Sequence, residues 1–139
     1  MTTNRFTQSQ IEAAYAKVKS GADYPKLVQD LKRLGIRAYD HIVSDGSNVF
    51  RGDQGHTVTT QHLGPTQPPI AVADHASTEK LKHYISIHQQ GQTHYAAFCG
   101  QAGEAGVAKW VSDLEKMTCT YLDKANHAML VEPIPVAGY

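Results

Sequence analysis

Four segments of the chain carry apolar residues at the three- and four-residue spacing that is typical of a helix with one buried face. Two segments lie in the first half of the chain and two in the second. Each follows a residue suited to a helix N-cap, in chain order Thr7, Asp23, Ser77 and Thr93. The four apolar stripes are Ile11-Ala14-Tyr15-Val18, Leu27-Val28-Leu31-Leu34, Leu81-Tyr84-Ile85-His88 and Tyr95-Phe98-Cys99-Ala102. We therefore expect four helices.

Local signals set the ends of these helices. Thr7 and Gln10 have the spacing of a capping box, in which each side chain accepts a hydrogen bond from the other residue's backbone N–H. Three helices are expected to end at a glycine, namely Gly21, Gly35 and Gly91. Gly100 and Gly103 lie inside the fourth helix, and each weakens it by about 1 kcal/mol relative to alanine. That helix should depend on tertiary packing or on a close backbone approach.

After each pair of helices the pattern changes to the β-branched and aromatic content of strands. We expect strands at 36–43, 47–51 and 56–61 in the first half and at 107–114, 117–122 and 128–134 in the second. A further short strand is expected at 70–73. Pro133 and Pro135 indicate that the final strand lies at a sheet edge or ends there.

Side-chain alternation predicts which strand residues share a face. If Asp45-Gly46 is a two-residue hairpin loop, one face carries an aromatic set and the other a mainly aliphatic set. The aromatic set is Tyr39, Val43 and Phe50, and the aliphatic set is Ile36, Ile42, Val49 and Val58. We expect the helices to cover the aromatic face, which leaves the partly apolar second face for a partner or a loop.

The second half of the chain resembles the first after a shift of 71 positions. The matched pairs include Tyr24/Tyr95, Leu27/Phe98, Gly35/Gly106, Ile36/Val107, Tyr39/Trp110, Val43/Leu114, Phe50/Tyr121, His56/His127 and Val58/Met129. An internal duplication with the element order ααβββ in 7–61 and again in 77–134, joined by a connector at 62–76, accounts for this pattern. The prediction is a single α+β domain spanning 1–139, in which four helices pack on one face of an antiparallel sheet.

Composition excludes several functional classes. Lys plus Arg and Asp plus Glu both total 13, and no basic run is longer than Lys32-Arg33, so a nucleic-acid footprint is not expected. No apolar stretch approaches the length of a membrane span and the start lacks a signal-peptide core, so we expect a soluble, cytoplasmic protein. Cys99 and Cys119 are the only cysteines, and both should be reduced and buried.

Eight histidines raise the question of a metal site. His83 and His88 are five residues apart and so lie on different helix faces. A structural zinc would need His88, Cys99, Cys119 and His127 to converge, and core or surface roles for these side chains are favoured. A histidine close to Cys99 would suggest a thiol nucleophile, but the place of Cys99 on an apolar stripe favours a core role. We therefore predict no metal, no cofactor and no catalytic residue.

The densest polar stretch, residues 88–95, joins the third and fourth helices, and we call it the polar elbow. Helix capping explains such a stretch, because helix ends leave backbone groups without partners. The alternative is a site for an anion or a small polar ligand at the start of the fourth helix. The residues assigned to that site are His88, Gln89, Gln92, Thr93, His94, Tyr95 and, behind them, Cys99.

Several strings of residues resemble the YbcV-like family, a bacterial and prophage-associated family of unknown function whose members are sometimes labelled phage envelope protein. They are Tyr24-Pro25-Lys26-Leu27, Leu34-Gly35, His88-Gln89-Gln90-Gly91-Gln92-Thr93 followed by Tyr95 and Phe98-Cys99, Ala105-Gly106-Val107 with Trp110, Met117-Thr118-Cys119-Thr120-Tyr121 and Met129-Leu130-Val131-Glu132. The resemblance covers nearly the whole chain and supplies no activity. The chain departs from the family pattern at His94, where an acidic residue is expected, and at Lys124-Ala125-Asn126, where a turn glycine is expected.

The leading functional hypothesis is a small non-enzymatic module that binds a partner protein or its own copy as a homodimer. The partly apolar second sheet face motivates it. The alternative is a small-molecule or anion binder, or an uncharacterised enzyme, that uses the polar elbow with Cys99. A phage structural component is a third possibility, by analogy alone.

Overall fold

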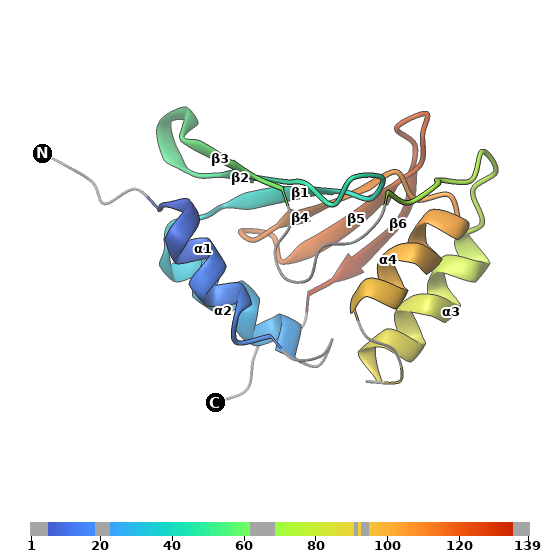
Figure 1. Cartoon of the computed structure of the whole chain (residues 1–139), viewed down its shortest axis with the longest axis horizontal. Coiled ribbons are helices and arrows are strands. Elements are labelled where there is room, and N and C mark those ends of the chain that lie inside the picture. Colours follow the sequence, from blue (N-terminus) through green and yellow to red (C-terminus); the bar gives the residue numbers. More distant parts are fainter. Residues whose placement is uncertain (1–5, 19–22, 62–68, 91, 93–94, 135–139) are drawn as a thin grey trace, which may run out of the picture.

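The computed structural model describes residues 6–18, 23–61, 69–90, 92 and 95–134, and this part of the chain has an α+β fold (Figure 1). Four helices lie on one side of a six-stranded antiparallel sheet, as the sequence predicts. The helices are α1 (Gln8–Tyr15), α2 (Tyr24–Arg33), α3 (Thr78–Gln89) and α4 (Tyr95–Glu104). The strands are β1 (Ala38–Ile42), β2 (Asn48–Arg51), β3 (Thr57–Thr60), β4 (Lys109–Asp113), β5 (Thr118–Leu122) and β6 (Ala128–Pro133).

The strand order is β3-β2-β1-β4-β5-β6, which the sequence left undecided. Each half contributes three consecutive strands, and the halves join through the antiparallel pair β1 and β4. In that pair Asp40 lies opposite Val111, the residue 71 positions later. On either side of it, Tyr39 lies opposite Ser112 and His41 lies opposite Trp110. The same shift relates Tyr39 to Trp110 and His41 to Ser112, so each of these pairs is the counterpart of the other. The two halves therefore meet as two copies in an isologous dimer would.

The bounds of the elements also follow the 71-residue shift. The bounds of α2 and α4 differ by 71, as do those of β1 and β4. Gly35 and Gly106 both have a positive φ, 96° and 94°, where glycine is favoured because it has no Cβ. The residue after each glycine donates a hydrogen bond back to the helix, Ile36 to Leu31 and Val107 to Ala102. A common origin of the halves stays a prediction.

Helix starts agree with the sequence more closely than helix ends. Thr7 and Gln10 form both bonds of the capping box, and Ser77 accepts from the backbone N–H of Lys80. Asp23 takes the N-cap position of α2 without a side-chain capping bond. The expectation that the first helix reaches Gly21 is wrong, since α1 ends at Tyr15 and tight turns follow it. None of the helices in the described part of the chain combines the length and apolar character needed to span a bilayer.

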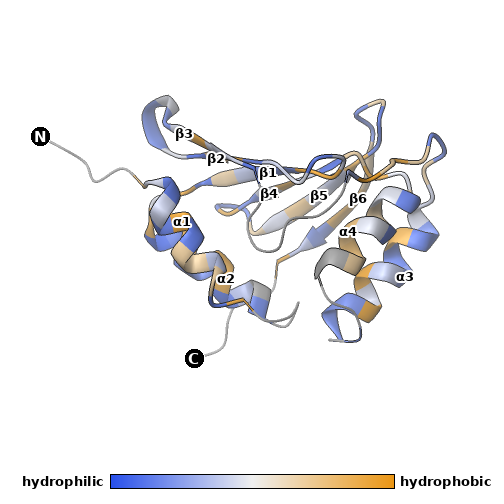
Figure 2. Cartoon of the chain, in the orientation of Figure 1, coloured by the Kyte–Doolittle hydropathy of each residue, from blue (hydrophilic) through white to orange (hydrophobic). Residues whose placement is uncertain are grey.

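The core lies between the helices and the aromatic face of the sheet, where Tyr39, Phe50, Trp110 and Tyr121 are buried. All four helices contain apolar residues (Figure 2), and Ile11, Leu31, Leu81 and Phe98 are among those that belong to this core. Two face assignments were wrong. Val58 lies opposite Phe50 and packs on the core, because β2 and β3 pair across a tight turn at 53–55. Ile36 is also buried in the core, because it closes the end of α2 before the strand begins.

The Asp45-Gly46 turn is wider than a two-residue loop, since His41 lies opposite Asn48. Residues 70–73 form no strand, although two of their N–H groups are bonded: Ile70 donates to Ser44 at 2.9 Å and Ala73 to Gly103 at 2.9 Å. A Cβ on Gly103 would lie 2.6 Å from Cγ2 of Ile70. The predicted close approach at α4 is therefore confirmed at Gly103.

Candidate functional site

The polar elbow is only partly within the described residues. His88 is half-buried near the end of α3, whereas Gln89 and Gln92 are exposed. The Gln92 amide donates to Gln90, and the Gln92 backbone N–H donates to Ile87. Thr93 and His94 lie outside the described residues, and Tyr95 begins α4. Gln92 is thus bonded to neighbouring residues of the chain, and the ligand site predicted in the elbow stays a prediction.

Cys99 belongs to a buried polar row that crosses from α4 onto the sheet. Its Sγ lies 3.9 Å from Nε2 of His41 on β1. Nδ1 of His41 is 2.7 Å from Oδ1 of Asn48 on β2, and Nδ2 of Asn48 is 3.3 Å from Oγ1 of Thr60 on β3. Each of the four residues is 2% or 3% exposed. The strand pairing places the three sheet residues side by side on one face.

The hydrogen bonds of this row fix which ring nitrogen of His41 carries the proton. Asn48 Nδ2 also donates to the carbonyl oxygen of Gly46 at 3.3 Å, and a carbonyl oxygen can only accept. The other amide atom, Oδ1, must then accept from Nδ1–H of His41. In the neutral ring Nε2 is left as an acceptor, and it faces the thiol of Cys99. A base facing a thiol, held in position by a third group, is the arrangement that activates sulfur nucleophiles.

Burial keeps the His41 ring neutral. Desolvation lowers the pKa of His41 below its usual 6.5, and this effect outweighs the hydrogen bond that His41 donates to Asn48 and the charge of Asp45, which both act in the opposite direction. A neutral ring is what a proton acceptor requires.

Aromatic side chains connect the polar row with the polar elbow. The His41 ring stacks on Trp110 with centroids 4.3 Å apart, and Trp110 packs against Phe98 at 5.6 Å. Phe98 in turn stacks on His88 at 4.6 Å. Of the predicted site residues, His88 joins this cluster by stacking on Phe98, and Cys99 joins it through its contact with His41. Gln89 and Gln92 lie on the surface.

The second cysteine has different surroundings. Cys119 on β5 accepts a long hydrogen bond from Ser112 Oγ at 3.8 Å. Burial raises the pKa of the Cys119 thiol to about 11, which keeps it protonated near neutral pH. Both cysteines are buried and neither forms a disulfide, as predicted, but among the described residues only Cys99 faces an imidazole nitrogen.

Sequence reasoning missed His41 and Asn48. The signal was available: in the strands of the aromatic face, positions 41 and 48 alternate in phase with Tyr39 and Phe50, so both point into the core. Buried polar side chains on such a face need partners, and they pair with one another. Among the described residues no group of three or more histidine, cysteine or acidic side chains is placed to hold a metal ion.

The comparisons with known proteins place the chain in a family. A model described as a protein of unknown function (DUF1398) matches residues 12–133. The chain is also 31% identical over 115 residues to uncharacterized proteins of Mycobacterium bovis and Mycobacterium tuberculosis, an alignment that covers 79% of this chain and 69% of each relative. The chain belongs to the DUF1398 family of proteins of unknown function.

Proposed function

We propose that Cys99 is a reactive thiol and that the protein captures small, uncharged electrophiles at this site. In the proposed step Cys99 attacks an activated carbon–carbon double bond while its proton moves to Nε2 of His41. An S–C bond forms as the π bond breaks, and His41 then returns the proton to the neighbouring carbon. Asn48 positions the ring through Nδ1. The observation that carries the proposal is the Cys99–His41–Asn48 arrangement.

The other half of the molecule argues against a purely structural role for this row. Under the 71-residue shift, His41, Asn48 and Cys99 correspond to Ser112, Cys119 and Val28. All three counterparts are buried in the same fold without an imidazole. Replacing both partners of a buried hydrogen bond by apolar groups of the same shape is often nearly neutral or even stabilising. The fold can thus fill these positions with other residues at a lower cost in folding free energy.

The surroundings favour an uncharged, flat ligand. Phe98 and Trp110 present aromatic surface next to Cys99 and His41. Because the residues of the row are only 2% or 3% exposed, a charged ligand would lose its hydration there. The polar elbow, which reaches the same aromatic cluster through His88, is the proposed entrance.

Access to a buried thiol requires a local opening, and α4 is suited to one. A Cβ on Gly100 would meet no atom within 4 Å, so packing does not require glycine at that position. Glycine there weakens the helix by about 1 kcal/mol. We propose that this weakness lets α4 open at Cys99 without global unfolding.

N-ethylmaleimide, a small neutral molecule with an activated double bond, tests the proposal. In a Cys119→Ser background it reports on Cys99 alone. His41→Asn is the informative change, because the new amide can still donate to Asn48 but offers no base. We expect about a 100-fold slower reaction of Cys99 in that variant, since general bases contribute roughly 10²- to 10⁴-fold.

Ser112→Ala, the corresponding change in the other half, is the control and should leave the rate unchanged. Urea unfolding of each variant separates reactivity from stability. Equal rates for His41→Asn and its parent, in folded proteins of similar stability, would refute the proposed role of His41.

A second candidate function is protein interaction, including homodimer formation, through the sheet face away from the helices. Val131 on β6 supports it, because it is 56% exposed on that face. Light scattering tests this idea: a concentration-dependent dimer that Val131→Lys abolishes is expected, and a monomer at high concentration would count against it. Cytoplasmic location, YbcV-like membership and a prophage origin are parts of this second proposal that rest on the sequence alone.

A further inference from the structure

The 71-residue shift relates two ends of the sheet that differ in their side chains. The first, which we call the ionic end, contains Arg37, Asp53 and Glu115. The second, which we call the groove end, contains their counterparts Ala108, Lys124 and Ser44. The backbone is the same at both ends: Leu114 N–H donates to Arg37 C=O at 2.8 Å, and Val43 N–H donates to Ala108 C=O at 3.0 Å.

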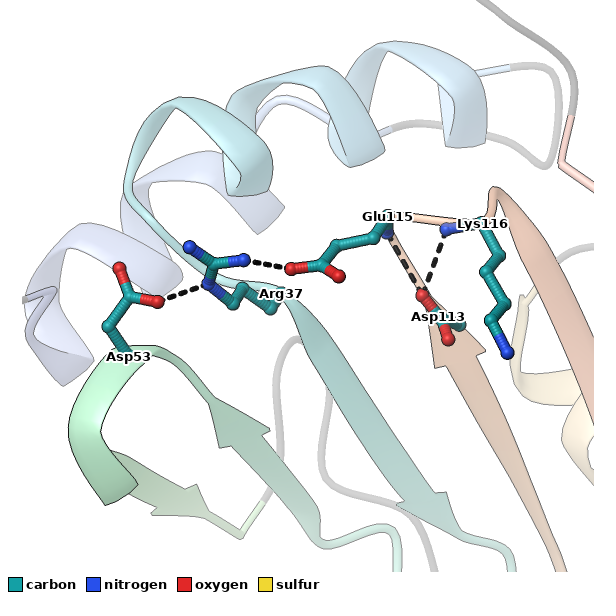
Figure 3. A network of polar contacts seen from close by, with 5 residues as sticks. All are labelled: Arg37, Asp53, Asp113, Glu115 and Lys116. Carbon is teal, nitrogen blue, oxygen red and sulfur yellow. Dashed lines mark hydrogen bonds and ion pairs between the residues drawn. The ribbon is translucent and has the colours of Figure 1, made fainter.

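At the ionic end a guanidinium joins two turns (Figure 3). Arg37 pairs with Asp53 in the β2–β3 turn and with Glu115 in the β4–β5 turn. These carboxylates raise the pKa of Arg37, chiefly through the hydrogen bond that Arg37 donates to Asp53 and then the one that it donates to Glu115. Asp113 holds the second turn by accepting from the N–H groups of Glu115 and Lys116, each at 3.0 Å.

At the groove end the corresponding space is open. A groove of about 510 Å³ is lined by Ile42, Ser44, Val72, Ala108, Lys109, Asp123, Lys124 and Asn126. Ala108 stands where the ionic end has Arg37, so no long side chain bridges the two turns there. A groove of this size is within the range of small-molecule sites, roughly 300–1,000 Å³.

The charges of the groove are opposite to those of the ionic end. Lys124 replaces Asp53, and Lys109 adds a second ammonium group. Lys124 is 2.7 Å from Asp74, whereas Lys109 makes no ion pair with a described residue. The carboxylate of Asp123 is hydrogen-bonded within its own turn, because it accepts from the N–H groups of Ala125 and His127 at 3.0 and 2.8 Å.

We propose that this groove binds a small amphipathic carboxylate. The carboxylate would lie between Lys109 and Lys124, and the apolar body would cover Ile42, Val72 and Ala108. The guest would thus supply the negative charge that Glu115 supplies at the ionic end and that Ser44 lacks. This site is separate from Cys99, which lies on the helix-covered face of the sheet.

Isothermal titration of the full chain with octanoate tests the proposal, with acetate and octanol as probes that lack the tail or the charge. Octanoate should bind at least tenfold more tightly than either. Ala108→Arg introduces at the groove end the arginine side chain that position 37 carries at the ionic end. This long side chain should occupy the groove, and octanoate binding should be lost. Lys109→Met keeps the apolar stem and should weaken binding about fivefold to tenfold, since charge-assisted hydrogen bonds exceed neutral ones.

Arg37→Ala, which makes the ionic end resemble the groove end, is the matched control and should leave octanoate binding unchanged. If octanol binds as tightly as octanoate, or if Lys109→Met binds as tightly as wild type, the proposed carboxylate site is wrong. Equal losses in Arg37→Ala and Ala108→Arg would also overturn it, because the effect would then not belong to the groove.

Discussion

The two halves of this molecule place different side chains at the same buried positions. In the first half, His41 and Asn48 share a strong hydrogen bond at the centre of the sheet. In the second half, Ser112 and Cys119 take those positions, and only a long contact to sulfur joins them. The backbone, the strand register and the burial are alike. The difference teaches that the fold needs a compact buried pair there, but not an imidazole.

The surroundings of the two thiols differ in the same way. Cys99 faces the acceptor nitrogen of a neutral His41, whereas Cys119 is surrounded by hydroxyl groups and has its pKa raised to about 11. Burial alone therefore does not decide which cysteine is reactive. On the proposed account, the neighbouring base makes Cys99 the more reactive of the two thiols.

The largest expected effect concerns the equivalent glycines Gly35 and Gly106. Alanine at Gly106 would be strained by its positive φ, and its Cβ would lie 2.7 Å from Cα of Ala76. Alanine at Gly35 would meet no atom within 4 Å, so its only cost would be the backbone strain of the positive φ. We expect about 4 kcal/mol of destabilisation for Gly106→Ala and about 2 kcal/mol for Gly35→Ala in urea unfolding. Equal values would show that the contact with Ala76 is not a real constraint.

The next effect compares His41 with Ser112. His41→Ala removes a buried ring and leaves Oδ1 of Asn48 without the donor Nδ1–H. We therefore expect the free energy of unfolding to fall by about 3 kcal/mol. Ser112→Ala removes a hydroxyl that donates to the sulfur of Cys119, a weak acceptor, and should cost about 1 kcal/mol or less. Chemical unfolding of both variants measures this contrast, and a cost for Ser112→Ala as large as that for His41→Ala would contradict it.

Acid should destabilise the protein partly through His41. The folded protein has a lowered pKa at His41, so below pH 6.5 the unfolded chain takes up a proton that the folded chain resists. Stability from this group is therefore complete above the unfolded value and is lost as the pH falls from about 6.5 toward the folded pKa. The slope for one proton is at most about 1.4 kcal/mol per pH unit.

His41→Asn should flatten the stability profile between about pH 6.5 and pH 5 relative to wild type. Comparison with the parent cancels the contributions of the other histidines. Parallel profiles for the two proteins would show that His41 titrates alike in the folded and unfolded states.

The smallest effect concerns Gly100, whose counterpart in α2 is Gln29. Gly100→Ala should stabilise the folded protein by about 0.5–1 kcal/mol, because alanine favours helix and meets no atom within 4 Å. If α4 opens locally at Cys99, the same change should slow the maleimide reaction of Cys99 by about twofold to fivefold. If the variant is more stable but the reaction rate of Cys99 is unchanged, the reaction does not depend on opening of α4.

Much of the fold could be predicted because it rests on local chemistry. Alternation defined the strands, and Gly35 and Gly106 marked the two places where helix changes to strand. Val58 was placed on the wrong face because the exact width of the turn before β3 decides the register, and several widths suit one sequence. Ile36 was misplaced because it closes the end of α2 before the strand begins.

The candidate site could not be predicted because its members come from distant parts of the chain. Cys99 and His41 are 58 positions apart, and their contact depends on how α4 crosses the β1–β4 join. The polar elbow was conspicuous because its polar residues are consecutive, yet the exposed Gln92 bonds to its neighbour Gln90. Asn48 lies in the strand predicted at 47–51, but only the observed strand register places it opposite His41.

The most direct test of the reactive-thiol account is the ratio of the maleimide reaction rates at Cys99 and Cys119 in one native sample. Mass spectrometry of the two peptides gives both rates at once, at neutral pH and at rising urea concentration. We expect Cys99 to react about 100-fold faster than Cys119 without urea, through a local opening that depends little on urea. If both thiols react at the same rate, with the urea dependence of global unfolding, Cys99 is a core residue and the account is wrong.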